Sequence, residues 1–190
     1  MQSSNFDMDS DYIQHVRYKL QKRLKRLNAA DFNGFHWVLL HTWGFLQENE
    51  ITKGILDDLE RRFPNLEQAA ETTLAGQCQV GESESENYAI CYWVVKKCVE
   101  SQKNDIEITV GHTLGQGSNF DDYIGSFRQT YVETLFDYID EQIDDKRMTL
   151  VLLKKFKHRC EWLRAGFTNT FTTKACSFIS NRSLRQEGST

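Results

Sequence analysis

The chain has one proline among its 190 residues and no uninterrupted apolar run long enough to cross a membrane. Because proline interrupts helices and is frequent in linkers, its near absence excludes a proline-rich linker and favours a helix-rich globular protein. The N-terminus, MQSSNFDMDSD, also lacks the basic and then apolar pattern of a signal peptide. The sequence therefore predicts a cytoplasmic protein without a membrane-spanning segment.

Cysteine usage agrees with that location. The five cysteines are an odd number and are scattered, and Cys91, Cys98 and Cys160 lie inside apolar helical patterns, where cysteine behaves as a small hydrophobic residue. With 39% hydrophobic and 26% charged residues, the composition is that of a globular and not a disordered chain. The net charge of -4 excludes general nucleic-acid affinity over the whole surface, although local basic patches can still bind phosphate.

Hydrophobic spacing predicts an all-α fold, a compact helical domain of about six or seven helices. The first helix starts at a cap formed by Asp9 or Ser10, after about nine frayed residues. The second is so apolar that we expect it in the middle of the fold. An acidic loop at 80–87 is expected to cap the helix that follows it. The predicted helices of this half are 10–28, 31–47, 51–63 before Pro64, a short polar one within 65–78, and 88–102.

The stretch 119–164 has the widest apolar stripe and reads as two long amphipathic helices joined by a short charged turn. We expect the rest of the chain to cover this pair. Before it, residues 104–119 alternate and then become glycine-rich, which favours an extended connector. Residues 1–164 are therefore predicted to form a single helical domain. Residues 165–190, rich in Thr, Ser and Asn, are predicted to be a polar extension or the start of an absent domain.

Catalytic and metal-binding patterns are missing. The glycines between 111 and 117 are not followed by the lysine of a phosphate-binding loop. His36 and His41 are five residues apart, which does not match the four-residue spacing of zinc proteases, and His158 with Cys160 has no second ligand pair nearby in sequence. No arginine precedes a histidine by the distance typical of helical ribonucleases of the HEPN type. The sequence thus predicts no catalytic residues, no metal and no cofactor.

Two basic segments, 17–26 and 154–164, contain the candidate binding residues. If the first and last long helices pack side by side, the segments merge into one positive surface that binds phosphates without sequence preference. Pairing with acidic helices of the same fold, or with an acidic partner, is the structural alternative. The candidate nucleic-acid-binding residues are Arg17, Lys22, Arg23, Lys25, Arg26, Lys154, Lys155, Lys157 and Arg159.

A resemblance bears on the second segment. The run 120–162 ends in LLKKFKHRCEW and resembles the helical N-terminal region of bacterial proteins associated with anti-phage defence or restriction, in which an acidic and aromatic helix precedes such a motif. The matching residues are Leu152, Leu153, Phe156, Lys157, Arg159, Glu161 and Trp162. In those relatives a nuclease-like domain follows, but no nuclease motif follows here, so the resemblance implies no cutting activity. Pairing of Lys157 with Glu161 and packing of Trp162 also explain the motif without any function.

These observations lead to one principal hypothesis and two alternatives. The principal hypothesis is a non-catalytic helical interaction or regulatory module, such as the sensing or scaffolding part of a bacterial defence system, with a protein partner. The first alternative is a nucleic-acid-binding module that uses 17–26 and 154–164. An enzyme is the third class, which the missing nucleophile, base and metal set disfavours. Self-association into a homo-oligomer is a further expectation, because exposed aromatic surface tends to pair.

Overall fold

The structure is a computed structural model that describes residues 10–101, 106–115 and 117–183, with side chains as far as Cys160. Every regular element in these ranges is helical, which confirms the predicted all-α fold. The expected frayed start, residues 1–9, lies outside the described residues. The chain divides into two units, Met1–Arg147 and Met148–Thr190, and helix α8 enters both. The predicted domain boundary at residue 164 stays a prediction.

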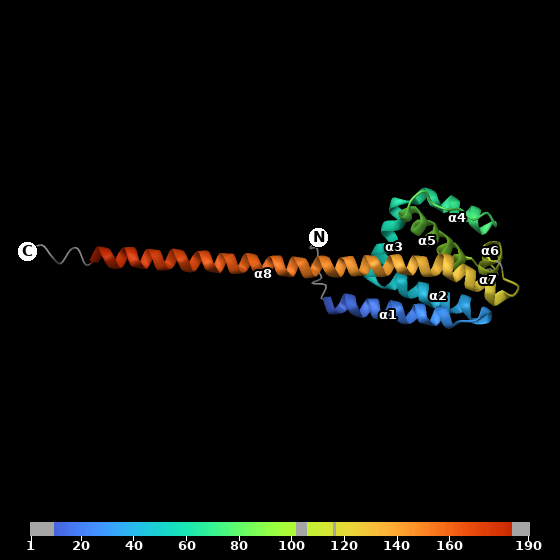
Figure 1. Cartoon of the computed structure of the whole chain (residues 1–190), viewed down its shortest axis with the longest axis horizontal. Coiled ribbons are helices and arrows are strands. Elements are labelled where there is room, and N and C mark those ends of the chain that lie inside the picture. The colour runs from blue at the N-terminus through green and yellow to red at the C-terminus, as the bar shows by residue number, and fades with distance from the viewer. Residues whose placement is uncertain (1–9, 102–105, 116, 184–190) are drawn as a thin grey trace, which may run out of the picture. The chain divides into compact units, whose positions relative to one another are not determined.

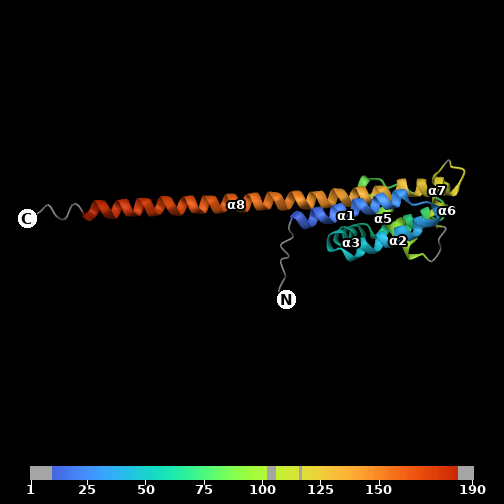
Figure 2. The same cartoon turned by 90° about the horizontal axis from the view of Figure 1, so that it is seen from below.

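The first three helices lie where the sequence places them. They are α1 (Ser10–Ala29), α2 (Phe32–Glu48) and α3 (Glu50–Arg62). Two short polar side chains set their boundaries, because the first amides of a helix need acceptors. Asp31 Oδ1 accepts from Gly34 N at the start of α2, and Asn49 Oδ1 accepts from Ile51 N and Thr52 N at the start of α3. Figure 2 shows α1 and the first part of α8 in one layer, with α2 and α3 in a second.

The next elements follow the only proline. Pro64 ends α3 and opens a single 3-10 turn, η1 (Pro64–Leu66), which leads into the short α4 (Glu67–Leu74). The predicted capping role of the acidic loop is confirmed for Ser83, whose Oγ accepts from Glu86 N, but α5 (Glu84–Glu100) begins four residues earlier than predicted and includes residues 84–87 of that loop. Among the described residues, α5 has the longest continuous run of buried side chains, from Ala89 to Val95. It therefore supplies the centre of the core in the first unit.

The extended connector predicted for 104–119 is wrong for residues 106–114. Residues Ile106–Leu114 form a helix, α6, and only 104, 105 and 116 lie outside the described residues. Two tertiary contacts explain the difference. Val110 is fully buried and Glu107 is 1% exposed, although an alternating strand would place these residues on opposite faces. Gly111 brings α6 against the backbone of Tyr123, which lies on α7 (Phe120–Phe127).

The charged turn predicted inside 119–164 is also absent. After α7 the chain passes through one π-helical stretch, η2 (Arg128–Glu133), and continues without a break into α8 (Thr134–Ser183). The sequence at the expected turn, DDKR, contains neither glycine nor proline. Its charges pair along the helix instead, because Asp144 Oδ1 accepts from Arg147 three residues later. The first part of α8 runs beside α1 in the first unit (Figure 1).

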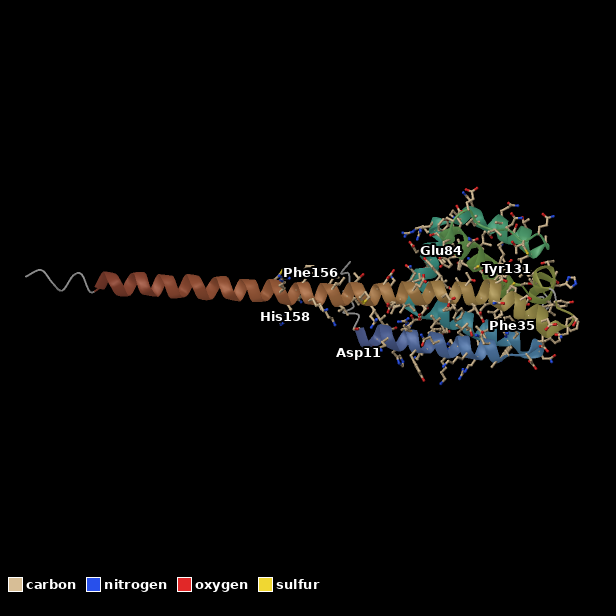
Figure 3. The ribbon with its side chains drawn as sticks, in the orientation of Figure 1. Asp11, Phe35, Glu84, Tyr131, Phe156 and His158 are labelled. Atoms are coloured by element: carbon tan, nitrogen blue, oxygen red, sulfur yellow. The ribbon has the colours of Figure 1, made fainter. Side chains whose placement is uncertain are left out.

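The core of the first unit is aromatic where these helices meet. Phe35 on α2 contacts Phe127 edge-on at 6.1 Å between ring centroids, and Phe127 in turn packs on Tyr131. Figure 3 labels Phe35 and Tyr131 in this region, and both are buried. The apolar stripe predicted for the first half of 119–164 therefore does face inward. No helix within the described ranges is both long and apolar enough to cross a membrane.

Candidate nucleic-acid interface

The amphipathic pattern of α1 determines which of its basic residues face solvent. Ile13, Val16, Leu20 and Leu27 are at most 1% exposed and hold one side of the helix against the core. Side chains at other positions around the helix must then point sideways or outward. Of the six basic residues between 17 and 26, two lie at the edges of the buried side and four are exposed. The exposed four are Lys19, Lys22, Lys25 and Arg26.

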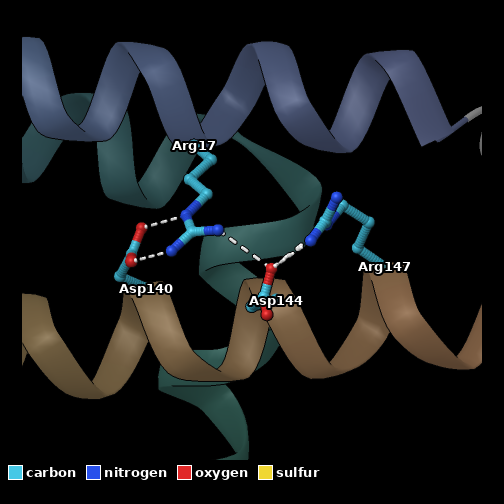
Figure 4. Close-up of polar contacts among 4 residues, drawn as sticks. All are labelled: Arg17, Asp140, Asp144 and Arg147. Atoms are coloured by element: carbon cyan, nitrogen blue, oxygen red, sulfur yellow. Dashed lines mark hydrogen bonds and ion pairs between the residues drawn. The ribbon is translucent and has the colours of Figure 1, made fainter.

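Arg17 lies at one edge of the buried side of α1, and its side chain is bonded within the fold. Its guanidinium donates from Nε and Nη2 to both carboxylate oxygens of Asp140, at 2.7 and 2.6 Å, and from Nη1 to Asp144 at 2.9 Å (Figure 4). The hydrogen bond to Asp140 raises the pKa of Arg17 above its ordinary value. About two thirds of the Arg17 side chain is covered. Arg17 therefore joins α1 to α8, which is the structural alternative considered for the basic segment.

Arg23 lies at the other edge, between α1 and α2. Its guanidinium carbon is 4.3 Å from the centroid of the Phe45 ring, and Nη1 donates to the His41 carbonyl at 3.3 Å. Burial lowers the pKa of Arg23, and the neighbouring charge of Arg26 lowers it further. Arg23 is thus half-buried and holds the two helices together through a cation–π contact and one hydrogen bond.

Lys19, Lys22, Lys25 and Arg26 form what we call the basic face of α1. All four are exposed, and none of the ion pairs found among the described residues includes one of them. The four residues lie within a stretch of eight positions, 19–26, so the face is about 10 Å long at 1.5 Å per residue. An array of this kind attracts a polyanion through charge, because the cations are not neutralised by the fold.

An exposed aromatic residue lies on the helix beside this face. Trp37 on α2 is 65% exposed, and its ring system forms a T-shaped contact with the His41 ring, with 4.3 Å between centroids and an interplanar angle of 83°. Sequence reasoning missed Trp37, because α2 was expected in the middle of the fold. The helix is apolar on nearly all sides, and the signal that marks its exposed side is the pair of polar residues Asn33 and His41, one helical turn before and after Trp37.

The second basic segment lies in the second unit. Lys155, Lys157 and Arg159 are exposed there, as are the apolar neighbours Leu152 and Phe156, and Lys154 is exposed but already makes an interaction. Figure 3 labels Phe156 and His158 on this part of α8. In the first unit α1 does pack beside α8, but it meets the acidic residues Asp140 and Asp144. Merging of the two basic segments into one surface stays a prediction.

Among the described residues of the first unit, the titratable groups with shifted pKa values do not form a recognisable catalytic set. Burial raises the pKa of the Cys91 thiol to about 12 and that of Cys98 well above its ordinary value, which disfavours the nucleophilic thiolate. His36 and Glu107 pair inside the fold, at 2.5 Å. Among the described residues, no three His, Cys, Asp or Glu side chains converge as a metal site would require.

Comparison with known proteins adds no family. No protein-family model matches the chain, and no curated protein and no solved structure is significantly similar to it. Functional inference therefore rests on the residues of this chain and their geometry.

Proposed function

We propose that this protein is a non-catalytic helical interaction module that binds nucleic acid through the basic face of α1. The observation that carries the proposal is that the basic residues of α1 fall into two groups, one bonded within the fold and one exposed to solvent. Arg17 and Arg23 are used by the fold, whereas Lys19, Lys22, Lys25 and Arg26 are exposed and unpaired among the described residues. Cations that contribute nothing visible to the fold are available for phosphates.

The size of the face sets the expected strength. A length of about 10 Å spans roughly three nucleotides of one strand, so three or four phosphates can be contacted at once. Binding by charge of this kind is sequence-independent and weak at physiological salt. With three or four contacts, the logarithm of the affinity for a single strand should fall against the logarithm of the salt concentration with a slope of about -2 to -3.

Fluorescence anisotropy of labelled DNA and RNA, at about 50 and about 150 mM salt, tests the proposal. The variant Lys22→Glu should weaken binding at the lower salt, because it reverses a charge in the middle of the face. Lys53→Glu is the matched control, since Lys53 is exposed on α3 and the substitution changes the net charge equally. Equal effects of the two variants, or no binding by the natural protein at the lower salt, would refute the proposal.

Whether the second basic segment, 154–164, contributes to nucleic-acid binding is tested with a separate variant. Lys154, Lys155 and Lys157 can be changed together to Glu, and Lys22, Lys25 and Arg26 likewise, with the same change in net charge. Loss of binding in both triple variants supports an interface that includes both segments. Loss only in the α1 variant restricts the interface to the first unit.

Binding to a protein partner is the second candidate function, and exposed apolar residues in the second unit support it. Leu152, Leu153 and Phe156 are between 50% and 64% exposed on α8. Exposed apolar residues grouped on one helix are typical of an interaction surface, and a second copy of the chain is the first partner to test. Sedimentation velocity should show association that Phe156→Glu reduces. A monomer at all concentrations would count against a second copy.

A role in bacterial defence is supported by the resemblance of 120–162 alone. The sensing or scaffolding part of such a system is a non-catalytic task that an all-α module can perform. Plating efficiency of phages on cells with and without the gene is the measurement, and unchanged plating over a broad phage panel would count against this role.

A further inference from the structure

The exposed Trp37 beside the basic face bears on whether the proposed interface prefers single-stranded or double-stranded nucleic acid. Trp37 is 65% exposed, whereas the other tryptophans with described side chains, Trp43 and Trp93, are 9% and 4% exposed. It lies on a regular helix, not on a loop, so the backbone beneath it is fixed. A large flat ring that is presented to solvent from a rigid element is a stacking platform, and no described residue other than His41 makes an aromatic contact with it.

Contacts within the fold hold this platform in place. His41, one helical turn further along α2, packs against Trp37 in a T-shaped contact, and its carbonyl accepts a hydrogen bond from Arg23. Phe45, one turn further again, lies under the Arg23 guanidinium. The stripe 37, 41 and 45 is thereby fixed along the edge of α1 that carries Arg23.

The same arrangement brings cations to the platform. A two-residue link joins α1 to α2, and the two helices run in opposite directions. Arg23 meets residues 41 and 45, so Arg26, one turn further along α1, comes level with the turn of α2 that carries Trp37. Helical spacing places Lys19 and Arg26 on the same side of α1 as Arg23, with Lys22 next to them around the helix. An exposed ring thus lies alongside exposed cations.

We propose that Trp37 stacks on a base of a single-stranded nucleic acid whose phosphates lie along Lys19, Lys22 and Arg26. The inference rests on the proposed function and makes it more specific. Single-strand sites combine a positive track for the backbone with aromatic side chains that stack on bases. In a duplex the faces of the bases are covered by their neighbours, so the ring has nothing to stack on. The basic face then binds single strands more tightly than duplexes of the same length.

The test is a set of anisotropy titrations with a labelled 15-nucleotide oligothymidylate and a 15-base-pair duplex. Trp37→Ala should weaken single-strand binding by about 5- to 100-fold, the range expected for one lost base stack, and should leave duplex binding unchanged. The slope of affinity against salt should also stay unchanged, because no phosphate contact is removed. Trp37→Phe should retain a large part of the affinity, since it keeps a stacking ring.

Tyr18 offers a matched control. It is 62% exposed on α1, close to the exposure of Trp37, and it lies on the basic face next to Lys22 but about 140° around the helix from Arg23 and thus away from α2. Tyr18→Ala should therefore weaken single-strand binding far less than Trp37→Ala. Circular dichroism of each variant verifies that the fold is retained, which is expected for exposed side chains.

The outcomes separate this inference from the proposed function. Equal affinity for both nucleic acids with no effect of Trp37→Ala overturns the stacking site and leaves charge-based binding in place. Equal losses for single strand and duplex, or a loss with Tyr18→Ala as large as with Trp37→Ala, also overturn it. No binding to either probe at low salt removes the proposed function and this inference together.

Discussion

His36 on α2 and Glu107 on α6 form an ionisable pair inside the first unit, with Nδ1 and Oε1 2.5 Å apart. Glu107 is 1% exposed, the His36 side chain is 18% exposed, and the second carboxylate oxygen, Oε2, is buried without a hydrogen-bond partner among the residues that the structure describes. A carboxylate in such a place depends on its one partner, because burial of a lone charge is costly.

Removal of His36 should accordingly destabilise the protein more than the size of the side chain suggests. We expect His36→Leu to lower the free energy of unfolding by about 3 kcal/mol, because Glu107 stays buried without a partner. The double variant His36→Leu/Glu107→Leu should be more stable than His36→Leu alone. Urea denaturation measures both. His15→Leu, at an exposed position of α1, is the control and should change stability by less than about 0.5 kcal/mol. The single variant Glu107→Leu completes the cycle, and strictly additive effects of His36→Leu and Glu107→Leu in the double variant would contradict this account.

Two helical glycines should respond in opposite directions to the same substitution. A Cβ at Gly111 would lie 1.9 Å from the backbone oxygen of Tyr123, so Gly111→Ala must push α6 away from α7 and should cost several kcal/mol. A Cβ at Gly44, inside α2, meets nothing within 4 Å. Gly44→Ala should therefore stabilise the protein by about 0.5–1 kcal/mol, because alanine favours the helix. Thermal denaturation of the pair tests this, and destabilisation by both would contradict it.

These contacts also show which helices could be predicted from the sequence and which could not. Local signals placed α1, α2 and α3, because their apolar spacing, caps and the proline are encoded within each segment. α6 was missed because the β-branched run around Ile106–Val110 favours a strand locally. Tertiary contacts, the burial of Glu107 beside His36 and the close approach at Gly111, override that preference.

The same limit applies to the candidate interface. The sequence identified the basic residues of α1, but it could not separate Arg17, whose partners Asp140 and Asp144 are more than a hundred residues away, from Arg26. The sequence did not distinguish Trp37 from the other aromatic residues of α2, because helical spacing gives no clear exposed side to a helix that is apolar almost all around. Only the packing of α2 shows which of its aromatic residues remains exposed.

Cysteine reactivity should follow burial. Cys78 and Cys160 are exposed, whereas Cys91 and Cys98 are buried with raised pKa values. Since the thiolate is the reactive form, iodoacetamide at about pH 8 should alkylate Cys78 and Cys160 in the native protein and spare the other two. Peptide mass spectrometry gives the extent at each site, and labelling in urea is the control in which all should react. Alkylation of native Cys91 as fast as that of Cys78 would show that this part of the core opens readily.

The buried thiols also predict a loss of stability at alkaline pH. In the unfolded chain Cys91 should titrate near its ordinary pKa of about 8.5, whereas burial raises the pKa in the native state to about 12. Between these values the native state binds more protons, so stability present below about pH 8 falls as the pH rises, by up to about 1.4 kcal/mol per pH unit for one such group.

Cys91→Val isolates this contribution, because it replaces the thiol by an apolar group of similar size. Urea denaturation from about pH 7 to about pH 10.5 should give a shallower decline for the variant above about pH 8.5, and the same pH dependence as the natural protein below it. Identical declines over the whole range would assign the alkaline sensitivity to other groups.

The same substitution, arginine to methionine, should have opposite effects at Arg17 and Arg26 when stability and nucleic-acid binding are compared. In the variants Arg17→Met and Arg26→Met, methionine keeps most of the apolar part of the arginine side chain and removes one positive charge. Arg17→Met should lower the free energy of unfolding by about 1–2 kcal/mol at low salt, because it breaks a bidentate pair with Asp140 that joins α1 to α8. The loss should shrink at about 1 M salt, since about a third of the pair is open to solvent. Arg26→Met should change stability by less than about 0.5 kcal/mol, as expected for an exposed side chain outside the ion pairs found among the described residues.

Nucleic-acid binding should rank the two variants in the reverse order. Arg26→Met removes a cation from the basic face of α1 and should weaken single-strand binding and make its salt dependence shallower by about 0.7 in slope. Arg17→Met should leave the slope unchanged, because the guanidinium is already occupied by two carboxylates. Because the loss of net charge is the same in both, a difference in slope cannot come from long-range attraction and must come from a lost phosphate contact. Equal slopes for the two variants would place the phosphates away from Arg26 and remove the basic face of α1 as the interface.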